Sequence, residues 1–261
     1  ERLLASARQR GRPKLVAATE IDVVTDLKRR IVEGLAILTG EGIMDGAGHL
    51  SARIPGTDTF LINPRFPGIL ADPDDICTVD LNAKRIGGRG PIPSESIIHA
   101  ILYRDRPDVQ SVVHCHARYS ILVSLLDSGL IPFSRTAASF DGVPVFPESH
   151  GINTPALAER FIRSIGDKAV ALLQGHGIVA TGPTVEGACI NGLNLEKASQ
   201  DQITMMSFTT PKPLAGRALG QSNERLENPY RMWPYLLNKH GIRPRAAIKA
   251  SIHSLPEGEH Y

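Results

Sequence analysis

VQSVVHCH, residues 109–116, is the stretch that decides how this chain folds. As an extended strand, it places alternate side chains on the same face of a sheet. His114 and His116 then point the same way, while Cys115 points the other way. Two imidazoles on one face of a strand offer two ligands to a metal ion. Two ordinary half-buried histidines are the alternative for an isolated pair of this kind.

Two further residues favour the metal. Glu95 lies upstream in Pro93-Ser94-Glu95, and His176 lies downstream in Gln174-Gly175-His176-Gly177. The backbone must turn tightly between the two glycines, and packing rarely requires an imidazole at such a position. Three imidazoles with a carboxylate suit manganese, zinc or iron and leave room for a substrate oxygen. We therefore predict a divalent metal site.

The rest of the chain alternates between helical and extended periods. Strands are expected at residues 49–54, 59–62, 76–80, 143–146, 169–173 and 178–180. Helices are expected at 21–40, from a Ser94 cap to Arg104, after His116, at 155–165, and from Pro183 to about Phe208. Strands with helices on both sides predict an α/β protein, a three-layer α/β/α sandwich.

The composition of the chain indicates which partners and which compartment to expect. The chain has 261 residues, 42% of them hydrophobic, which is ample for a core, and a net charge of +2 indicates neither a nucleic-acid nor a membrane partner. Cys77, Cys115 and Cys189 are odd in number and form no CxxC pair, which favours a reducing compartment. No apolar run approaches the length that a bilayer needs. We expect a cytoplasmic protein with a small-molecule substrate.

Several blocks of the sequence, taken in order, resemble the class II aldolase/adducin family. They are Gly48-His49-Leu50-Ser51-Ala52-Arg53, Pro93-Ser94-Glu95, His99, residues 103–109, residues 112–116, and Gln174-Gly175-His176-Gly177. The match covers roughly residues 20 to 208. The resemblance implies that His114, His116 and His176 are metal ligands and that Glu95 is a ligand or an acid/base beside the ion. It also implies a mixed, largely antiparallel central sheet and a homotetramer with sites between subunits.

The same resemblance sets the expected domains. Residues 1–208 form a catalytic domain with an N-terminal arm at 1–18, and residues 209–261 form a C-terminal extension. The arm carries a basic cluster at 8–14, which fits a solvated arm or a subunit contact. The extension has no strong period but contains aromatic residues at 228–235. We expect it to pack on its own domain or on a neighbouring subunit.

Departures from the sugar-phosphate aldolase pattern bear on the substrate. His49 replaces an asparagine of that pattern, Arg65 and Phe66 replace a turn of small hydroxyl residues, and Pro93-Ser94 replaces a serine pair. The lost groups are donors that cradle a phosphate. Arg65 can pair with a carboxylate and Phe66 can stack on a ring. A solvated loop arginine and a strand histidine bonded to backbone are the alternatives for Arg65 and His49.

These features resemble the branch of the family that acts on hydroxylated aromatic or heteroaromatic carboxylates. The resemblance implies a manganese-dependent decarboxylase, with 3-hydroxy-2-methylpyridine-4,5-dicarboxylate of pyridoxine degradation as a candidate substrate. Zinc and iron are alternative metals. The predicted substrate-binding residues are His49, Arg65, Phe66 and Ser94, and the predicted catalytic residue is Glu95.

Other functions and residues remain open. An aldolase acting on a sugar phosphate or an aromatic aldol is the first alternative, with an iron-dependent oxygenase as a further variant. A non-catalytic, adducin-like interaction module is the second. His99 is expected to pack beside a ligand or hold one in place, because it lies one turn beyond Glu95. Gly175 and Gly177 are expected to serve backbone geometry, and the loop residues Glu148, Ser149 and His150 are weaker candidates for the pocket mouth.

Overall fold

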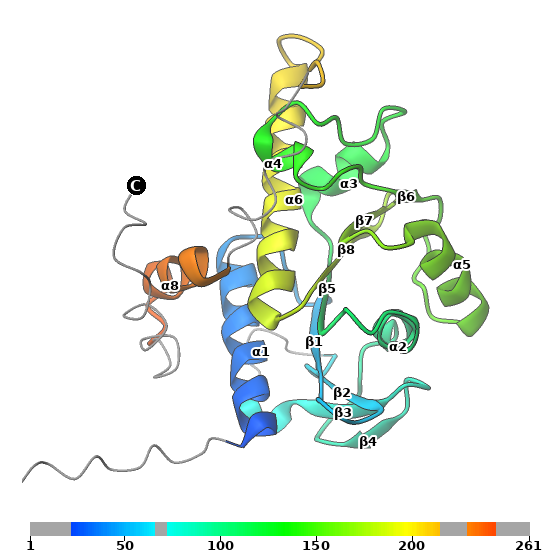
Figure 1. Ribbon diagram of the computed structural model, residues 1–261, viewed down its shortest axis with the longest axis vertical. Coiled ribbons are helices and arrows are strands. Elements are labelled where there is room, and N and C mark those ends of the chain that lie inside the picture. The colour runs from blue at the N-terminus through cyan, green and yellow to red at the C-terminus, as the bar shows by residue number, and fades with distance from the viewer. Residues whose placement is uncertain (1–21, 66–71, 215–228, 244–261) are drawn as a thin grey trace, which may run out of the picture.

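A computed structural model of the chain describes residues 22–65, 72–214 and 229–243. In this part of the chain eight strands form one sheet in the order β4-β3-β2-β1-β5-β8-β7-β6 (Figure 1). The strands are β1 (His49–Arg53), β2 (Thr59–Ile62), β3 (Cys77–Asp80), β4 (Arg85–Gly87), β5 (Ser111–Cys115), β6 (Val145–Phe146), β7 (Val170–Leu173) and β8 (Gly177–Gly182). The histidine strand β5 therefore lies in the middle of the sheet.

The sheet is mixed and largely antiparallel, as expected. β5 pairs antiparallel with β1 on one side and with β8 on the other. β7 and β8 form the expected hairpin around His176. Only the pair of β6 and β7 is parallel in the described sheet. This topology brings the ends of β5 and β8 together beside the hairpin turn.

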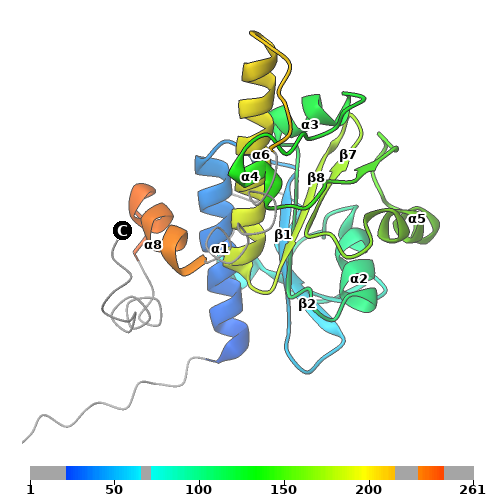
Figure 2. The same cartoon turned by 45° about the horizontal axis from the view of Figure 1, so that its top comes forward.

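Helices cover both faces of the sheet, which confirms the three-layer prediction (Figure 2). The helices are α1 (Val23–Gly40), α2 (Ser96–Asp105), α3 (Arg118–Ser124), α4 (Arg135–Ala138), α5 (Pro155–Ile165), α6 (Val185–Met206) and α8 (Pro229–Lys239), with a 3-10 turn η2 at Pro73–Asp75. One core joins α1, α6 and α8 to the sheet, and Cys115 belongs to it. The other joins α2 and α5, and Val112 belongs to it.

Local sequence explains where several helices begin. The Asp22 side chain accepts a hydrogen bond from the Thr25 amide at the start of α1. Thr154 caps α5, with Pro155 in its first turn. Thr184 caps α6 by accepting from the Gly187 amide. Such caps satisfy amide groups that have no partner within the helix.

Other expectations were wrong. Ser94 does not cap α2: Glu95 occupies that position, its side chain makes no capping bond, and the helix begins at Ser96. Pro183 precedes the Thr184 cap and lies outside the first turn of α6. No helix was predicted in the C-terminal extension, which contains α8, and Trp233 of this helix is buried in the core with α1 and α6. Strand β4 and helix α4 were not predicted.

Some predictions fall outside the described residues. These are the N-terminal arm at 1–18, Phe66, and most of the C-terminal extension. Within the described residues, none of the helices combines the length and the apolar character that a membrane span requires.

Candidate metal centre

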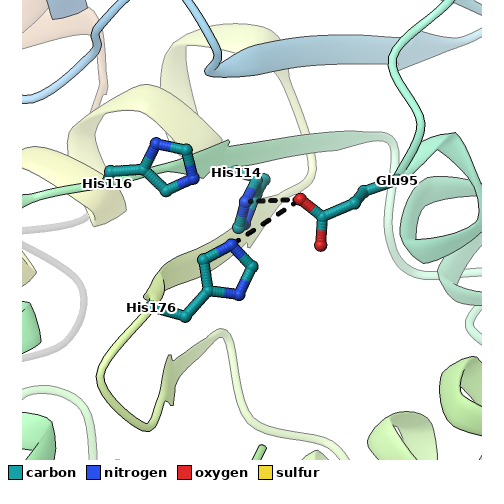
Figure 3. A group of neighbouring side chains, drawn as sticks. All are labelled: Glu95, His114, His116 and His176. Atoms are coloured by element: carbon teal, nitrogen blue, oxygen red, sulfur yellow. Dashed lines mark ion pairs between the residues drawn. The ribbon is translucent and has the colours of Figure 1, made fainter. Parts of the chain in front are cut away.

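The four predicted ligand residues come together at one point beside the sheet. Their ligand atoms, one from each of Glu95, His114, His116 and His176, all lie within 4.8 Å of one another. Glu95 Oε2 lies 3.4 Å from His114 Nε2 and 3.6 Å from His176 Nε2. Figure 3 shows these two rings directed at the carboxylate, with the His116 ring beside them. The cluster is the size that a single ion can bridge after small side-chain adjustments.

The sheet positions the histidines. His114 lies in β5 opposite His49 of β1 and Val179 of β8. His116 follows the last residue of β5, and His176 lies in the turn between β7 and β8. Gly175 has φ of +67° in that turn, a conformation that glycine adopts without strain. A Cβ at Gly177 would lie 2.5 Å from the Cys115 carbonyl oxygen, so the expected backbone roles of both glycines are confirmed.

Hydrogen bonds fix the orientation of two of the rings. His114 Nδ1 lies 2.9 Å from the Ile178 carbonyl oxygen, and His116 Nδ1 lies 3.0 Å from Asp45 Oδ2. Both partners are acceptors, so each Nδ1 carries the proton and each Nε2 keeps its lone pair. A hydrogen bond from the second ring nitrogen is the usual way in which proteins orient a metal-binding histidine.

Glu95 enters the cluster from the other side. Its Oε1 accepts a hydrogen bond of 2.7 Å from the Ile152 amide, which leaves Oε2 to face the histidines. Burial alone would raise the pKa of the Glu95 carboxyl. The close contact with His114, the nearby His176 ring and the Ile152 amide outweigh burial and lower this pKa to about 2. Glu95 is therefore a carboxylate at neutral pH.

His176 is also available as a ligand at neutral pH. Burial lowers its pKa to about 4, and the neighbouring His114 and His116 rings add to this effect although Glu95 acts in the opposite direction. Its Nδ1 is buried without a hydrogen-bond partner among the described residues. The ring is thus held by its place in the turn and by packing.

The residues fit a divalent cation. His114 Nε2 is buried and accepts no hydrogen bond from any described residue, yet it faces a carboxylate oxygen. Two acceptors in such a position repel each other unless a cation lies between them. Nitrogen ligands with one carboxylate suit manganese, zinc or iron. The geometry therefore supports a metal at the predicted place.

The predicted substrate-binding residues differ in their burial and in their position relative to the cluster. His49 is buried beside the cluster, with its ring centroid 4.8 Å from that of His114. Ser94 is exposed next to Glu95. Arg65 is exposed after β2, and its amide donates to the Pro91 carbonyl in the segment that leads to Glu95. His99 makes hydrogen bonds to His49 and Ser51, so its observed partners are not the predicted ligands.

A loop passes close to the Glu95 side of the cluster. Gly151 lies so close to Glu95 that a Cβ there would be 3.3 Å from the carboxyl carbon. Of the weaker candidates in this loop, His150 is highly exposed and pairs with Glu148 at 3.2 Å. A Cβ at Gly175 would lie 4.0 Å from the Ser149 Cβ, so the loop and the hairpin turn meet near the cluster.

Two positioning residues escaped sequence reasoning. Asp45 orients His116 from 71 residues away in the chain. Asn63 accepts from the Leu50 amide and donates to the Gly48 carbonyl, so it fixes the backbone on both sides of His49. The only local signal for Asp45 is its place before a glycine-rich turn, where it also accepts from the Ala47 amide.

Known proteins are similar to this chain in sequence and in fold. Residues 29–203 match the model of the Class II Aldolase and Adducin N-terminal domain. The chain is 32% identical over 178 residues to 3,4-dihydroxyphthalate decarboxylase of Arthrobacter keyseri, covering 61% of this chain and 71% of the relative. It is 30% identical over 192 residues to L-fuculose phosphate aldolase of Escherichia coli K12, covering 72% and 87%.

The fold itself also has solved counterparts. An aldolase II superfamily protein from Pseudomonas syringae superposes with a TM-score of 0.76 at 24% identity, covering 85% of this chain and 94% of the other. L-fuculose 1-phosphate aldolase from Glaciozyma antarctica gives a TM-score of 0.73 at 21% identity, covering 87% and 97%. The family match spans the sheet, α2 and all four clustered residues. This chain belongs to the class II aldolase and adducin family.

Proposed function

We propose that this protein is a metal-dependent decarboxylase of hydroxylated aromatic or heteroaromatic carboxylates. The observation that carries the proposal is the cluster of Glu95 with three histidines, whose ligand atoms lie within 4.8 Å of one another. Relatives named 3,4-dihydroxyphthalate decarboxylase are 32% and 27% identical to the chain. Decarboxylases and aldolases both cleave carbon–carbon bonds, so lyase activity is the broader statement that the family supports.

The two candidate dicarboxylates have a pattern of ring substituents in common. In 3,4-dihydroxyphthalate, two neighbouring carboxylates share a ring, and a hydroxyl group lies next to one of them. The candidate 3-hydroxy-2-methylpyridine-4,5-dicarboxylate has the same three substituents in the same order. We propose that this pattern is what the site binds, with the hydroxyl and its neighbouring carboxylate beside the ligand cluster. The second carboxylate is then available to Arg65, and Phe66 is proposed to stack on the ring.

The reaction needs an electron acceptor and a proton. His114, His116 and His176, with Glu95 beside them, would hold a divalent cation, which supplies positive charge next to the oxygen that becomes negative as carbon dioxide leaves. Glu95 Oε2 takes the proton of the ring hydroxyl when the substrate binds, because the carboxyl is ionised at neutral pH. Glu95 then gives its proton to the ring carbon that bears the neighbouring carboxylate. The bond between that carbon and the carboxylate breaks, its electron pair returns to the hydroxyl oxygen, and solvent reprotonates that oxygen.

The test uses purified protein loaded with manganese, zinc or iron in turn. Carbon dioxide release is measured with each of the two dicarboxylates, and metal content is measured by elemental analysis. We expect release with at least one dicarboxylate, highest with manganese. H114A is expected to bind less metal and to lose activity. Metal-loaded protein that releases no carbon dioxide from either compound would exclude this substrate class.

One specific observation favours a second candidate. The 30% identity to L-fuculose phosphate aldolase covers 72% of the chain, more than the decarboxylase match covers. An aldolase would release an aldehyde from a sugar phosphate, so L-fuculose 1-phosphate is assayed in parallel. Protein that binds no metal and cleaves neither class of compound would instead fit an adducin-like interaction module.

We also propose that the protein assembles as a homo-oligomer, a tetramer as the family resemblance implies. Apolar side chains at the end of α6 support this proposal. Met205, Met206 and Phe208 are 37%, 41% and 86% exposed. Light scattering coupled to size-exclusion chromatography measures the mass directly, and a monomer at micromolar concentration would contradict the proposal.

A further inference from the structure

A buried chain of hydrogen bonds runs from the candidate metal centre along the interface between β1 and α2. His49 Nδ1 lies 2.6 Å from His99 Nε2, and His99 Nδ1 lies 2.6 Å from Ser51 Oγ. Ser51 Oγ in turn lies 2.6 Å from the Tyr103 hydroxyl oxygen. All four residues are at most 2% exposed. The reaction described above uses none of these side chains.

The periods of the two elements explain why these side chains meet. Alternate residues of β1 share a face, and every fourth residue of α2 shares a face. The β1 set is His49, Ser51 and Arg53. The second set is the N-cap residue Glu95 with His99 and Tyr103 of α2. Arg53 ends the series, with its guanidinium 4.9 Å from the centre of the Tyr103 ring. Glu95 begins it at the metal centre, so the chain is built onto the same helix face as a predicted ligand.

Each of the three hydrogen bonds in this buried series contains one proton. His49 and His99 are 2% and 0% exposed, and no carboxylate is hydrogen-bonded to either ring among the described residues. A buried imidazolium without such a partner is strongly unfavourable. Both imidazoles are therefore neutral, and a neutral imidazole has one N–H donor and one acceptor. Among the described residues the Ser51 hydroxyl has no partner besides His99 and Tyr103, so it donates its one hydrogen to one of them and accepts from the other. The protons therefore run from His49 to Tyr103 throughout, or from Tyr103 to His49 throughout.

The hydroxyl group of Tyr103 determines which way the hydrogen bonds of the chain are donated. If the protons ran towards Tyr103, the hydroxyl hydrogen of Tyr103 would need a separate acceptor. Among the described residues, Ser51 Oγ is the only acceptor that the hydrogen bonds give to this hydroxyl. A buried donor without an acceptor is unfavourable. Tyr103 therefore donates to Ser51, Ser51 donates to His99, and His99 donates to His49.

We propose that this chain holds His49 with its proton on Nε2, so that His49 is a neutral hydrogen-bond donor to an anionic oxygen of the substrate. In the described residues no protein group bonds to His49 Nε2, and the ring lies 4.8 Å from the ring of His114. A protonated Nε2 cannot bind a metal, which separates His49 from the ligands. This inference rests on the proposed function, because the acceptor is the substrate's carboxylate or its deprotonated hydroxyl.

The roles within the chain differ. His49 touches the substrate, and its donor is fixed before binding, so it lowers the energy of the negative charge that develops as the carbon–carbon bond breaks. Ser51, His99 and Tyr103 are positioning residues, because they act only through His49. Substrates with an anionic oxygen at this point are preferred over neutral analogues of the same shape.

A pair of buried serines gives a matched test. Ser51 and Ser111 are both 0% exposed and lie on neighbouring strands, but the Ser111 hydroxyl donates only to the Ser51 carbonyl, at 2.7 Å. In the full-length, manganese-loaded protein we expect S51A to lower kcat/KM for the better dicarboxylate about 10-fold to 100-fold, with unchanged metal content. S111A keeps the wild-type rate and shares only the loss of thermal stability. Equal activity of the two variants would overturn the proposal.

Substitution of His49 itself tests the donor. We expect H49L to lower kcat about 100-fold and H49Q to recover part of that loss, because the glutamine amide is also a donor. Bound metal should not change in either variant. Loss of the metal together with activity would instead make His49 a ligand and contradict the assignment.

A spectroscopic measurement separates this proposal from the proposed function. In full-length, zinc-loaded protein with ¹⁵N-labelled histidine, long-range ¹H–¹⁵N correlations report which ring nitrogen carries the proton. We expect His49 and His99 both to be protonated on Nε2, and S51A to give a mixture of tautomers at His49. A wild-type His49 protonated on Nδ1 overturns the proposal whatever the substrate. The expected tautomer with no turnover of either dicarboxylate rejects only the proposed function.

Discussion

Asp45 shows how a single side chain outside the ligand set shapes the candidate centre. Its carboxylate accepts from His116 Nδ1 at 3.0 Å, and the same residue accepts from the Ala47 and Gly48 amides. We expect D45A to weaken manganese binding about 10-fold to 100-fold, because the His116 ring is no longer held with Nε2 towards the cluster. Isothermal titration of the metal-free protein measures this. D105N, which alters a surface pair with Arg104, is the control and should bind manganese as the wild type does.

Gly177 tests the close approach of two strands beneath the cluster. A Cβ there would lie 2.5 Å from the Cys115 carbonyl oxygen and 3.2 Å from the His116 ring. We therefore expect G177A to lower the free energy of unfolding by about 1–3 kcal/mol and to weaken metal binding, since β5 and β8 must separate. Urea unfolding measures the first effect. G46A, where nothing lies within 4 Å of the added carbon, should be nearly neutral, and an equally neutral G177A would contradict this view of the hairpin.

At the scale of elements, a distant carboxylate holds the start of α3, directly after His116. Glu196 of α6 accepts from the Tyr119 and Ser120 amides, both at 2.8 Å, and from the Ser120 hydroxyl at 2.7 Å. Removing it leaves partly buried amides without partners, so we expect E196A to lower the unfolding free energy by about 1–3 kcal/mol. E196Q keeps one acceptor oxygen and should lose less. E159A, on the exposed surface of α5, is the matched control for thermal unfolding.

The docking of α8 predicts a dependence on pH. Burial would raise the pKa of Glu41, but hydrogen bonds from Lys239 and His240 outweigh it and lower the pKa below the ordinary 4.5. A lowered pKa in the folded state stabilises α8 above about pH 4.5, and this stabilisation is lost as the pH falls through that range. Trp233 of α8 is the single tryptophan of the chain and is 1% exposed, so its fluorescence reports the docking.

We expect the Trp233 emission of the wild type to move to longer wavelength as the pH falls below about 4.5. E41Q should show a smaller acid-induced change, because its side chain cannot ionise. E159Q should follow the wild type. Identical curves for wild type and E41Q would show that Glu41 does not hold α8.

The elements that could be predicted from the sequence are those with a strong period or a recognised cap. The apolar spacing along α1 and the Thr154-Pro155 start of α5 are local signals, and both helices lie where they were expected. Strand β4 has only three residues, two of them exposed, so it carries almost no pattern. Helix α8 contains an internal Pro234, a residue that argues against a helix in sequence-based prediction. Ser94 was predicted to cap α2 from local sequence alone. In the structure Glu95 holds the cap position, and its side chain accepts from the Ile152 amide, 57 residues away, a contact that local sequence does not indicate.

At the scale of the whole molecule, the candidate centre draws on three distant segments. The spacing of His114 and His116 is a local signal, and Glu95 and His176 lie in sequence blocks that resemble the family. The set of four could therefore be predicted from the sequence alone. The side chains that support this region of the structure could not. Asp45, Asn63 and Glu196 act across 71, 13 and 77 residues, and no sequence pattern links an acceptor to a donor at such separations. Only the sheet order places them together.

Because the four residues join α2, β5 and the β7–β8 hairpin, metal binding should stabilise the entire fold. Without a cation, His114 Nε2 and Glu95 Oε2 face each other as acceptors at 3.4 Å in a partly buried site. A ligand that binds only the folded state adds about 2.7 kcal/mol to the unfolding free energy at a concentration one hundred times its Kd. We therefore expect manganese to raise the Tm in a concentration-dependent way and EDTA to lower it. H114A should respond to neither, while H150A, which alters an exposed loop histidine, should respond as the wild type does. A wild-type Tm that ignores both manganese and EDTA would mean that the cluster does not hold a metal, because binding to the folded state alone cannot leave stability unchanged.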